Sequence, residues 1–230
     1  MRLICLPFAG GSANHYWDWP TYLSPDVEVV AVQLPGRADR LAEAALDSVD
    51  PLADQLLDGL SPYLDLPLAI FGHSMGALIG FELVRRLRAT GREPVHFFAS
   101  GCPAPHLARD RSTDRHLLPD REFLSAVVAM DGVPREVLEE PELVELVLPA
   151  LRSDFTLVET YGFRPQPPLS CPVSAFGGDH DAEVSRGEVE AWSCHALDRF
   201  RFRMLPGGHF FVNTCRPALL RLIDEELARV

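Results

Sequence analysis

Short runs of apolar residues recur along the chain, and within each run the apolar positions are nearly continuous instead of alternating with polar ones. Strands that are covered on both faces have this pattern. The runs therefore predict six buried strands, at Leu3–Leu6, Val27–Val32, Leu68–Phe71, Val95–Ala99, Val173–Phe176 and Phe200–Leu205. Helix-like segments lie between or after them, at Ser48–Tyr63, Met75–Thr90, Arg186–Leu197 and Arg216–Val230. This order predicts an α/β fold with a mostly parallel sheet flanked by helices.

One stretch breaks the alternation of strands and helices. From Pro103 to Pro168 no strand pattern occurs, and helix-like pieces lie at Asp120–Met130, Pro134–Glu139 and Pro141–Tyr161. A stretch of this length is too long for a plain connection between two strands. We expect a single domain over residues 1–230, with residues 103–168 inserted as a helical lid. Helices that merely cover an edge of the sheet are the alternative.

The composition is that of an ordinary globular protein, with 47% hydrophobic and 23% charged residues. No apolar run approaches the roughly 20 residues of a membrane span, and the first residues lack the pattern of a signal peptide. We therefore expect a cytoplasmic protein without membrane contact. The five cysteines show no C-x-x-C pattern, which fits reduced thiols. A formal net charge of −12 argues against nucleic acid as a partner.

The segment Gly72-His73-Ser74-Met75-Gly76 has the G-x-S-x-G pattern of a nucleophile elbow. It stands between a predicted buried strand and a predicted helix, which is the context that the elbow requires. Its glycines permit a strained turn that exposes the Ser74 hydroxyl. The free N–H groups at the start of the helix face the place where negative charge develops. The pattern predicts Ser74 as a nucleophile, and a purely structural turn is the alternative.

A serine nucleophile needs a base, and the base needs an acid that orients it. Among eight histidines, His209 stands between the last predicted strand and the last helix, where this fold places the base. His73 should point away from the serine hydroxyl and pack beneath it. Asp179 and Asp181 both follow the preceding strand. The G-x-x-D-x-x-V spacing favours Asp181, while Asp179 could instead cap the loop. The order Ser, Asp, His is that of α/β-hydrolases.

Backbone N–H groups must also bind the oxygen that becomes negative during catalysis. One donor is expected to be Met75, the first residue after the nucleophile. The other should come from the glycine-rich loop Pro7-Phe8-Ala9-Gly10-Gly11-Ser12, which follows the first strand. Ala9 is our choice, with Phe8 as the alternate. The loop lacks the patterns G-K-[ST] and G-x-G-x-x-G, so a phosphate-binding loop is disfavoured. We expect neither a metal nor a cofactor.

Several segments, in order and at matching spacing over essentially the whole chain, resemble the type II thioesterases of polyketide and nonribosomal peptide synthesis. They are Pro7-Phe8-Ala9-Gly10-Gly11, Leu34-Pro35-Gly36-Arg37, Gly72-His73-Ser74-Met75-Gly76, Pro206-Gly207-Gly208-His209-Phe210-Phe211 and the insert segment from Ser153 to Tyr161. The resemblance implies hydrolysis of stalled or aberrant acyl thioesters on the 4′-phosphopantetheine arm of acyl or peptidyl carrier proteins, through an acyl-serine. It also implies Ser74, Asp181 and His209 as the catalytic triad.

Other functions remain open at this point. A general carboxylesterase and a chain-releasing fatty acyl thioesterase would share the fold, and an inactive hydrolase-fold binding module is a third alternative. Carrier proteins are usually acidic and the chain is acidic too, so docking must use local arginines or apolar contact. Arg37 and Arg40 are our candidates for contacts with the carrier or its pantetheine, although Arg37 could equally brace its own loop. We expect the chain to be a monomer.

Overall fold

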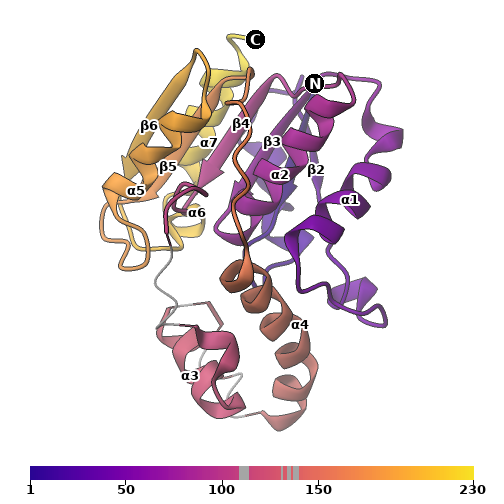
Figure 1. Cartoon of the computed structure of the whole chain (residues 1–230), viewed down its shortest axis with the longest axis vertical. Helices are drawn as coiled ribbons and strands as arrows, with labels where there is room; N and C mark the ends of the chain where they lie inside the picture. Colours follow the sequence, from indigo (N-terminus) through magenta and orange to yellow (C-terminus); the bar gives the residue numbers. More distant parts are fainter. Residues whose placement is uncertain (109–113, 131, 134–135, 137–139) are drawn as a thin grey trace.

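The central feature of the computed structural model is a sheet of parallel strands (Figure 1). The structure describes residues 1–108, 114–130, 132–133, 136 and 140–230. Within them, six strands pair in the order β2-β1-β3-β4-β5-β6. Their bounds are β1 Arg2–Leu6, β2 Glu28–Ala31, β3 Leu68–His73, β4 His96–Ser100, β5 Val173–Gly178 and β6 Phe200–Leu205. The predicted strands and their parallel pairing are confirmed.

Successive side chains of the central strands enter two separate apolar layers, one on each face of the sheet. In β1, Ile4 and Leu6 belong to one layer and Leu3 and Cys5 to the other. This division follows from the alternation of side chains along a strand. Because both faces of the sheet are covered, the residues that point to either face are apolar. The apolar runs in the sequence are continuous for this reason.

The α-helices of the described residues are α1 Val49–Gly59, α2 Met75–Ala89, α3 Asp120–Ala129, α4 Pro141–Thr160, α5 Arg186–Glu190, α6 Phe211–Thr214 and α7 Arg216–Leu227. Apart from α3 and α4, they divide between the two faces of the sheet. Apolar residues of α1, α2 and α5 share one layer, and those of α6 and α7 share the other. Figure 1 shows α1 and α2 side by side on one face. In the described part of the chain, no helix is long and apolar enough to cross a membrane.

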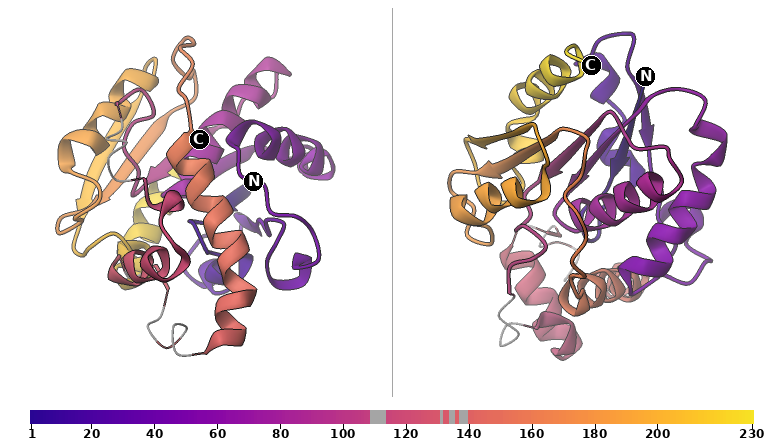
Figure 2. Two further views of the ribbon diagram at one scale, coloured as in Figure 1. Left: turned by 60° about the horizontal axis from the view of Figure 1, so that its bottom comes forward. Right: turned by 45° about the horizontal axis from the view of Figure 1, so that its top comes forward.

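Residues 103–168 leave the sheet after β4 and return to it before β5, and their described part holds no strand. Helices α3 and α4 confirm the predicted helices at Asp120–Met130 and Pro141–Tyr161, while the piece expected at Pro134–Glu139 lies largely outside the described residues. Both helices lie beyond one end of the sheet, at the bottom of Figure 1 and of the right view in Figure 2. A small core of their own holds them together, formed by Phe123, Leu124, Val127, Leu151 and Phe155.

Candidate active site

Ser74 stands on a strained turn between β3 and α2. Its backbone has φ +53° and ψ −117°, a region that side chains other than glycine rarely adopt. The flanking glycines are required by close packing. A Cβ at Gly72 would overlap the carbonyl of Gly76, and a Cβ at Gly76 would overlap the carbonyl of Leu6. The elbow motif thus has the structural context that the sequence predicts.

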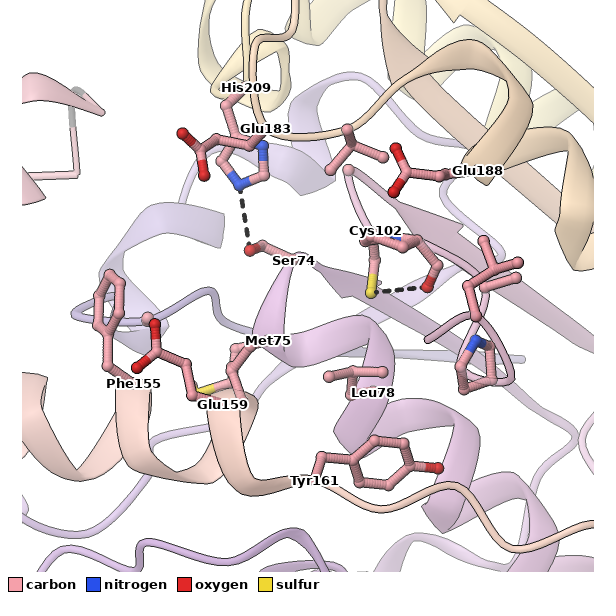
Figure 3. Close-up of a pocket in the computed structure, with 18 of the residues that line it drawn as sticks. Ser74, Met75, Leu78, Cys102, Phe155, Glu159, Tyr161, Glu183, Glu188 and His209 are labelled. Carbon is pink, nitrogen blue, oxygen red and sulfur yellow. Dashed lines mark hydrogen bonds between the residues drawn. The ribbon is translucent and has the colours of Figure 1, made fainter. Parts of the chain in front are cut away.

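The structure brings Ser74, His209 and Asp181 together from three separate loops. His209 Nε2 lies 3.1 Å from Ser74 Oγ, and His209 Nδ1 lies 2.9 Å from Asp181 Oδ2 (Figure 3 shows the first contact). The Asp181 side chain is fully buried, and its Oδ1 accepts the N–H groups of Glu183 and Val184. This arrangement suits a neutral imidazole that donates from Nδ1 to the carboxylate and accepts the serine proton at Nε2.

Asp179, the competing aspartate, has a different set of partners. Its Oδ1 accepts the N–H of Gly207 at 2.9 Å and lies 2.6 Å from His180 Nδ1. The bond from Gly207 is the main reason why the pKa of this exposed carboxyl lies below its usual range. Asp179 therefore ties the loop after β5 to the loop that carries His209. The geometry agrees with the sequence-based preference for Asp181 as the partner of the base.

The loop after β1 forms a tight turn beside the serine. The N–H of Gly11 donates to the carbonyl of Phe8 at 2.8 Å, and Gly10 has φ +75°. Ala9 and Met75 both face the cavity that holds Ser74, whereas Phe8 is buried in the core. In the part of the chain that the structure describes, no acceptor is assigned to the N–H of Ala9 or of Met75. Both N–H groups are therefore available to a substrate oxygen.

A cavity of about 690 Å³ opens next to Ser74 and His209 (Figure 3). Most of the residues that line it are apolar, among them Leu78, Cys102, Phe155, Val158, Tyr161 and Phe163. Three of these six residues come from α4 or directly follow it. Charged side chains line the cavity as well, namely Arg115, Glu159, Glu183 and Glu188. In the lining, Glu183 pairs with Arg115 of the insert at 2.8 Å; Glu183 lies on the loop after β5 that carries Asp181, here called the acid loop. A chamber of this size, with apolar residues over much of its wall, has room for an acyl chain.

The family model for the thioesterase domain matches residues 1–227. This chain belongs to the thioesterase family. Among its relatives is "Thioesterase PikA5" of Streptomyces venezuelae, which is 44% identical over 215 residues, with 93% of this chain and 76% of PikA5 covered.

Two solved structures extend the comparison of this thioesterase to the fold. RedJ, a thioesterase from the prodiginine pathway of Streptomyces coelicolor, is 38% identical with a TM-score of 0.92, covering 98% of this chain and 90% of RedJ. BorB, a type II thioesterase from the borrelidin biosynthetic cluster, is 41% identical with a TM-score of 0.88, covering 99% and 91%. The predicted α/β-hydrolase fold and the resemblance to type II thioesterases are confirmed. The enzyme is a hydrolase that acts on thioesters.

Arg37 of this thioesterase does not offer its guanidinium to the surface. It makes a bidentate ion pair with Asp154 of α4, at 2.6 and 2.7 Å, and the side chains are only 11% and 2% exposed. The alternative that Arg37 braces its loop is the one that this geometry supports, because a carrier would have to break a buried pair to reach it. Arg40 pairs with Glu43 and donates to the carbonyl of Gln33, and it stays partly exposed.

His73 occupies the place beneath the elbow that the sequence suggested. It is fully buried, and its Nδ1 lies 2.9 Å from Ser100 Oγ. Burial is the main reason why the pKa of His73 lies well below its usual range, with the nearby charge of His209 adding to the effect. A neutral packing residue fits these surroundings.

Asp154 is the residue of this region that reasoning from the sequence missed. It lies within the insert segment that carried the family resemblance, but no role was assigned to it. A signal was present, because Asp154 stands between Leu151 and Phe155 on the apolar side of a helix. Charged residues are almost never fully buried unless they are paired. That position therefore pointed to a buried partner, although not to which one.

Proposed function

We propose that this enzyme is a type II, editing thioesterase. It hydrolyses aberrant or stalled acyl groups from the 4′-phosphopantetheine arm of acyl or peptidyl carrier proteins in polyketide or nonribosomal peptide biosynthesis. The observation that carries the proposal is the match to BorB, which is named a type II thioesterase, over 99% of this chain and 91% of that one. A chamber lined mostly by apolar residues, beside a Ser–His–Asp arrangement, supports it.

The reaction runs in two half-reactions through an acyl-serine. His209 Nε2 takes the proton of Ser74 as Oγ attacks the thioester carbonyl, and the carbonyl oxygen becomes negative. The C–S bond then breaks, and the pantetheine thiol leaves with the proton from His209. In the second half-reaction, His209 takes a proton from water and the resulting hydroxide attacks the acyl-serine. The bond from carbon to Ser74 Oγ then breaks, His209 returns the proton to Oγ, and the carboxylic acid leaves.

The proposed roles of the remaining site residues follow from charge. Asp181 holds the imidazole in place and stabilises the imidazolium that forms. The N–H groups of Ala9 and Met75 stabilise the oxyanion, and one such donor contributes about 10²–10³ to the rate in serine hydrolases. Each of these steps uses only groups of the protein, the substrate and water.

In this proposal, residues 103–168 form a lid within a single domain of residues 1–230. Their helix α4 supplies Phe155 and Val158 to the chamber wall, and Arg115 contacts the acid loop in the same lining. A lid in this position excludes water from the acyl chain and must move to admit it.

The experiment compares one short acyl group on two thiols. We expect kcat/KM to be at least about tenfold higher for the acyl carrier protein than for the acyl-cysteamine, or about 1.4 kcal/mol of transition-state binding. The extra binding comes from the pantetheine arm and the carrier surface, which a small acyl group cannot replace. The same acyl group on free pantetheine separates the contribution of the arm from that of the carrier. Equal rates on all three thiols, or faster hydrolysis of simple oxygen esters, would replace this proposal by a general esterase.

A further inference from the structure

The carboxylate of Asp154 joins three segments that are far apart in the sequence. It projects from α4 and is buried. Oδ2 accepts the N–H of Gly10 at 2.7 Å, and both oxygens accept hydrogen bonds from the guanidinium of Arg37. Burial acts to raise the pKa of this carboxyl, and the hydrogen bonds from Arg37 act against that rise. One side chain of the insert therefore holds the loops after β1 and β2 together.

The turn of residues 8–11 is fixed from both sides by this arrangement. Asp154 holds the N–H of Gly10, and Arg37 Nη1 donates to the carbonyl of Gly11 at 3.3 Å. Leu151, one helical turn before Asp154, blocks the remaining space, since a Cβ on Gly10 would approach its Cδ1 to 2.9 Å. With the N–H of Gly10 occupied, the N–H of Ala9 is the donor of this turn that is left to face the cavity.

A buried ion pair is a poor device for stability alone, because the cost of removing two charges from water roughly offsets their attraction. It does fix geometry, and an oxyanion hole depends on donors that are already aimed before the charge appears. We propose that Asp154 and Arg37 are positioning residues, which hold the turn so that the N–H of Ala9 points at the oxyanion. This inference rests on the serine mechanism proposed above.

The arrangement also connects the acyl chamber to the oxyanion hole. Phe155, the next residue after Asp154, lines the chamber. The half of α4 that is anchored to the core therefore carries both the carboxylate that holds the turn of Ala9 and a wall residue of the chamber.

The test compares two replacements of the pair. Arg37→Gln with Asp154→Asn removes both charges but keeps a carbonyl oxygen for the N–H of Gly10. Arg37→Met with Asp154→Leu keeps the volume and removes that acceptor, and Asp154→Ala serves in its place if this double variant does not fold. Glu82→Gln is the control, because it removes the charge from another buried arginine–carboxylate pair, with Arg85, away from the turn. The glutamine keeps an oxygen for the hydroxyl of Tyr161, which lines the chamber.

Each variant is measured with two ligands that differ in one respect. A trifluoromethyl ketone analogue of the acyl group reacts with Ser74: the Oγ–C bond forms, the serine proton passes to His209, and the ketone oxygen becomes an oxyanion. A thioether analogue binds without forming an oxyanion. We expect the double variant Arg37→Met, Asp154→Leu, here called the apolar pair, to bind the ketone at least tenfold more weakly than the parent enzyme and the thioether less than twofold more weakly. Its kcat should fall and its KM should change little. The double variant Arg37→Gln, Asp154→Asn and the control Glu82→Gln should keep the ratio of ketone affinity to thioether affinity within threefold of that of the parent enzyme.

The inference is overturned if the apolar pair binds both ligands more weakly by the same factor. It is also overturned if the loss of activity in the apolar pair only parallels a loss of melting temperature, as in Glu82→Gln. Ser74→Ala separates this failure from a failure of the proposed mechanism. If Ser74→Ala remains active, the serine mechanism itself is wrong. If Ser74→Ala is inactive while the affinity ratio does not change in the apolar pair, only the positioning role is wrong.

Discussion

At the scale of single residues, the two aspartates of the loop after β5 accept hydrogen bonds from backbone N–H groups. Asp181 is buried and accepts two backbone N–H groups besides its contact with His209. Such donors compensate the loss of water around a charge and hold the side chain in one orientation. The two acids of the loop after β5 have different partners, since Asp179 bonds to the N–H of Gly207 and Asp181 contacts the imidazole of His209. We therefore expect them to have separate roles.

Exchange of these acids for amides should separate the two roles. We expect Asp181→Asn to lower kcat by about 10³–10⁴, because an amide favours the wrong imidazole tautomer. Asp179→Asn, the matched control, keeps an oxygen for the N–H of Gly207 and should lower kcat by less than about tenfold. Steady-state kinetics on one acyl-cysteamine measure both. Equal losses, or a larger loss in Asp179→Asn, would show that the acids are assigned in the wrong order.

The positions of the site residues were predictable from the sequence where the contacts are local or follow from the order of strands. Asp181 was selected by the G-x-x-D-x-x-V spacing, and the structure shows that its backbone donors lie two and three residues away. Arg37 was not assigned a single role, because its partner Asp154 lies 117 residues away in the insert. No pattern within the sequence specifies a contact across that distance.

At the scale of secondary-structure elements, α4 consists of two unlike halves that meet at Pro149. Residues before Pro149 are mostly exposed, among them Leu143 and Leu146. Residues after it are anchored to the core by Leu151 and Asp154. Proline lacks the N–H that would bond to the carbonyl four residues earlier, so the helix is weakest at this position. Movement of the proposed lid is therefore expected before Pro149 and not after it.

Replacement of this proline should stiffen the lid. We expect Pro149→Ala to raise the melting temperature, since proline costs a helix interior up to about 3 kcal/mol relative to alanine. If lid movement admits the substrate, hydrolysis of the acyl group from the carrier protein should become about threefold slower or more. Pro141→Ala is the control, because Pro141 occupies the first turn, where proline is tolerated. A stabilised Pro149→Ala enzyme with unchanged turnover would contradict movement at this hinge.

Element bounds were predictable in proportion to the length and regularity of the apolar pattern. The expected helix Ser48–Tyr63 ends at Gly59, because Pro62 cannot continue it and a 3₁₀ turn follows. The expected helix Arg186–Leu197 changes to a 3₁₀ helix after Glu190. Helix α6, at Phe211–Thr214, was not predicted, since four residues are too few to show a helical period.

At the scale of the whole molecule, the site collects at one edge of the sheet because all its strands are parallel. The turn with Ala9 follows β1, Ser74 follows β3, Asp181 follows β5 and His209 follows β6. Loops at the carboxyl ends of parallel strands meet at the same edge, so the order of elements was enough to predict that these residues approach one another. The chamber was not predictable in this way, because its wall depends on how the insert packs over that edge.

The central claim is that Ser74 carries the acyl group between the thiol and water, and acid quenching during turnover tests it most directly. Intact-protein mass and peptide mapping of the quenched enzyme should show one acyl group, on the peptide that contains Ser74. Ser74→Ala should fold with an unchanged melting temperature, carry no acyl group, and lose kcat by at least about 10³-fold. A folded Ser74→Ala enzyme that keeps substantial turnover, or an acyl group found instead on Cys102 in the same chamber, would contradict the claim.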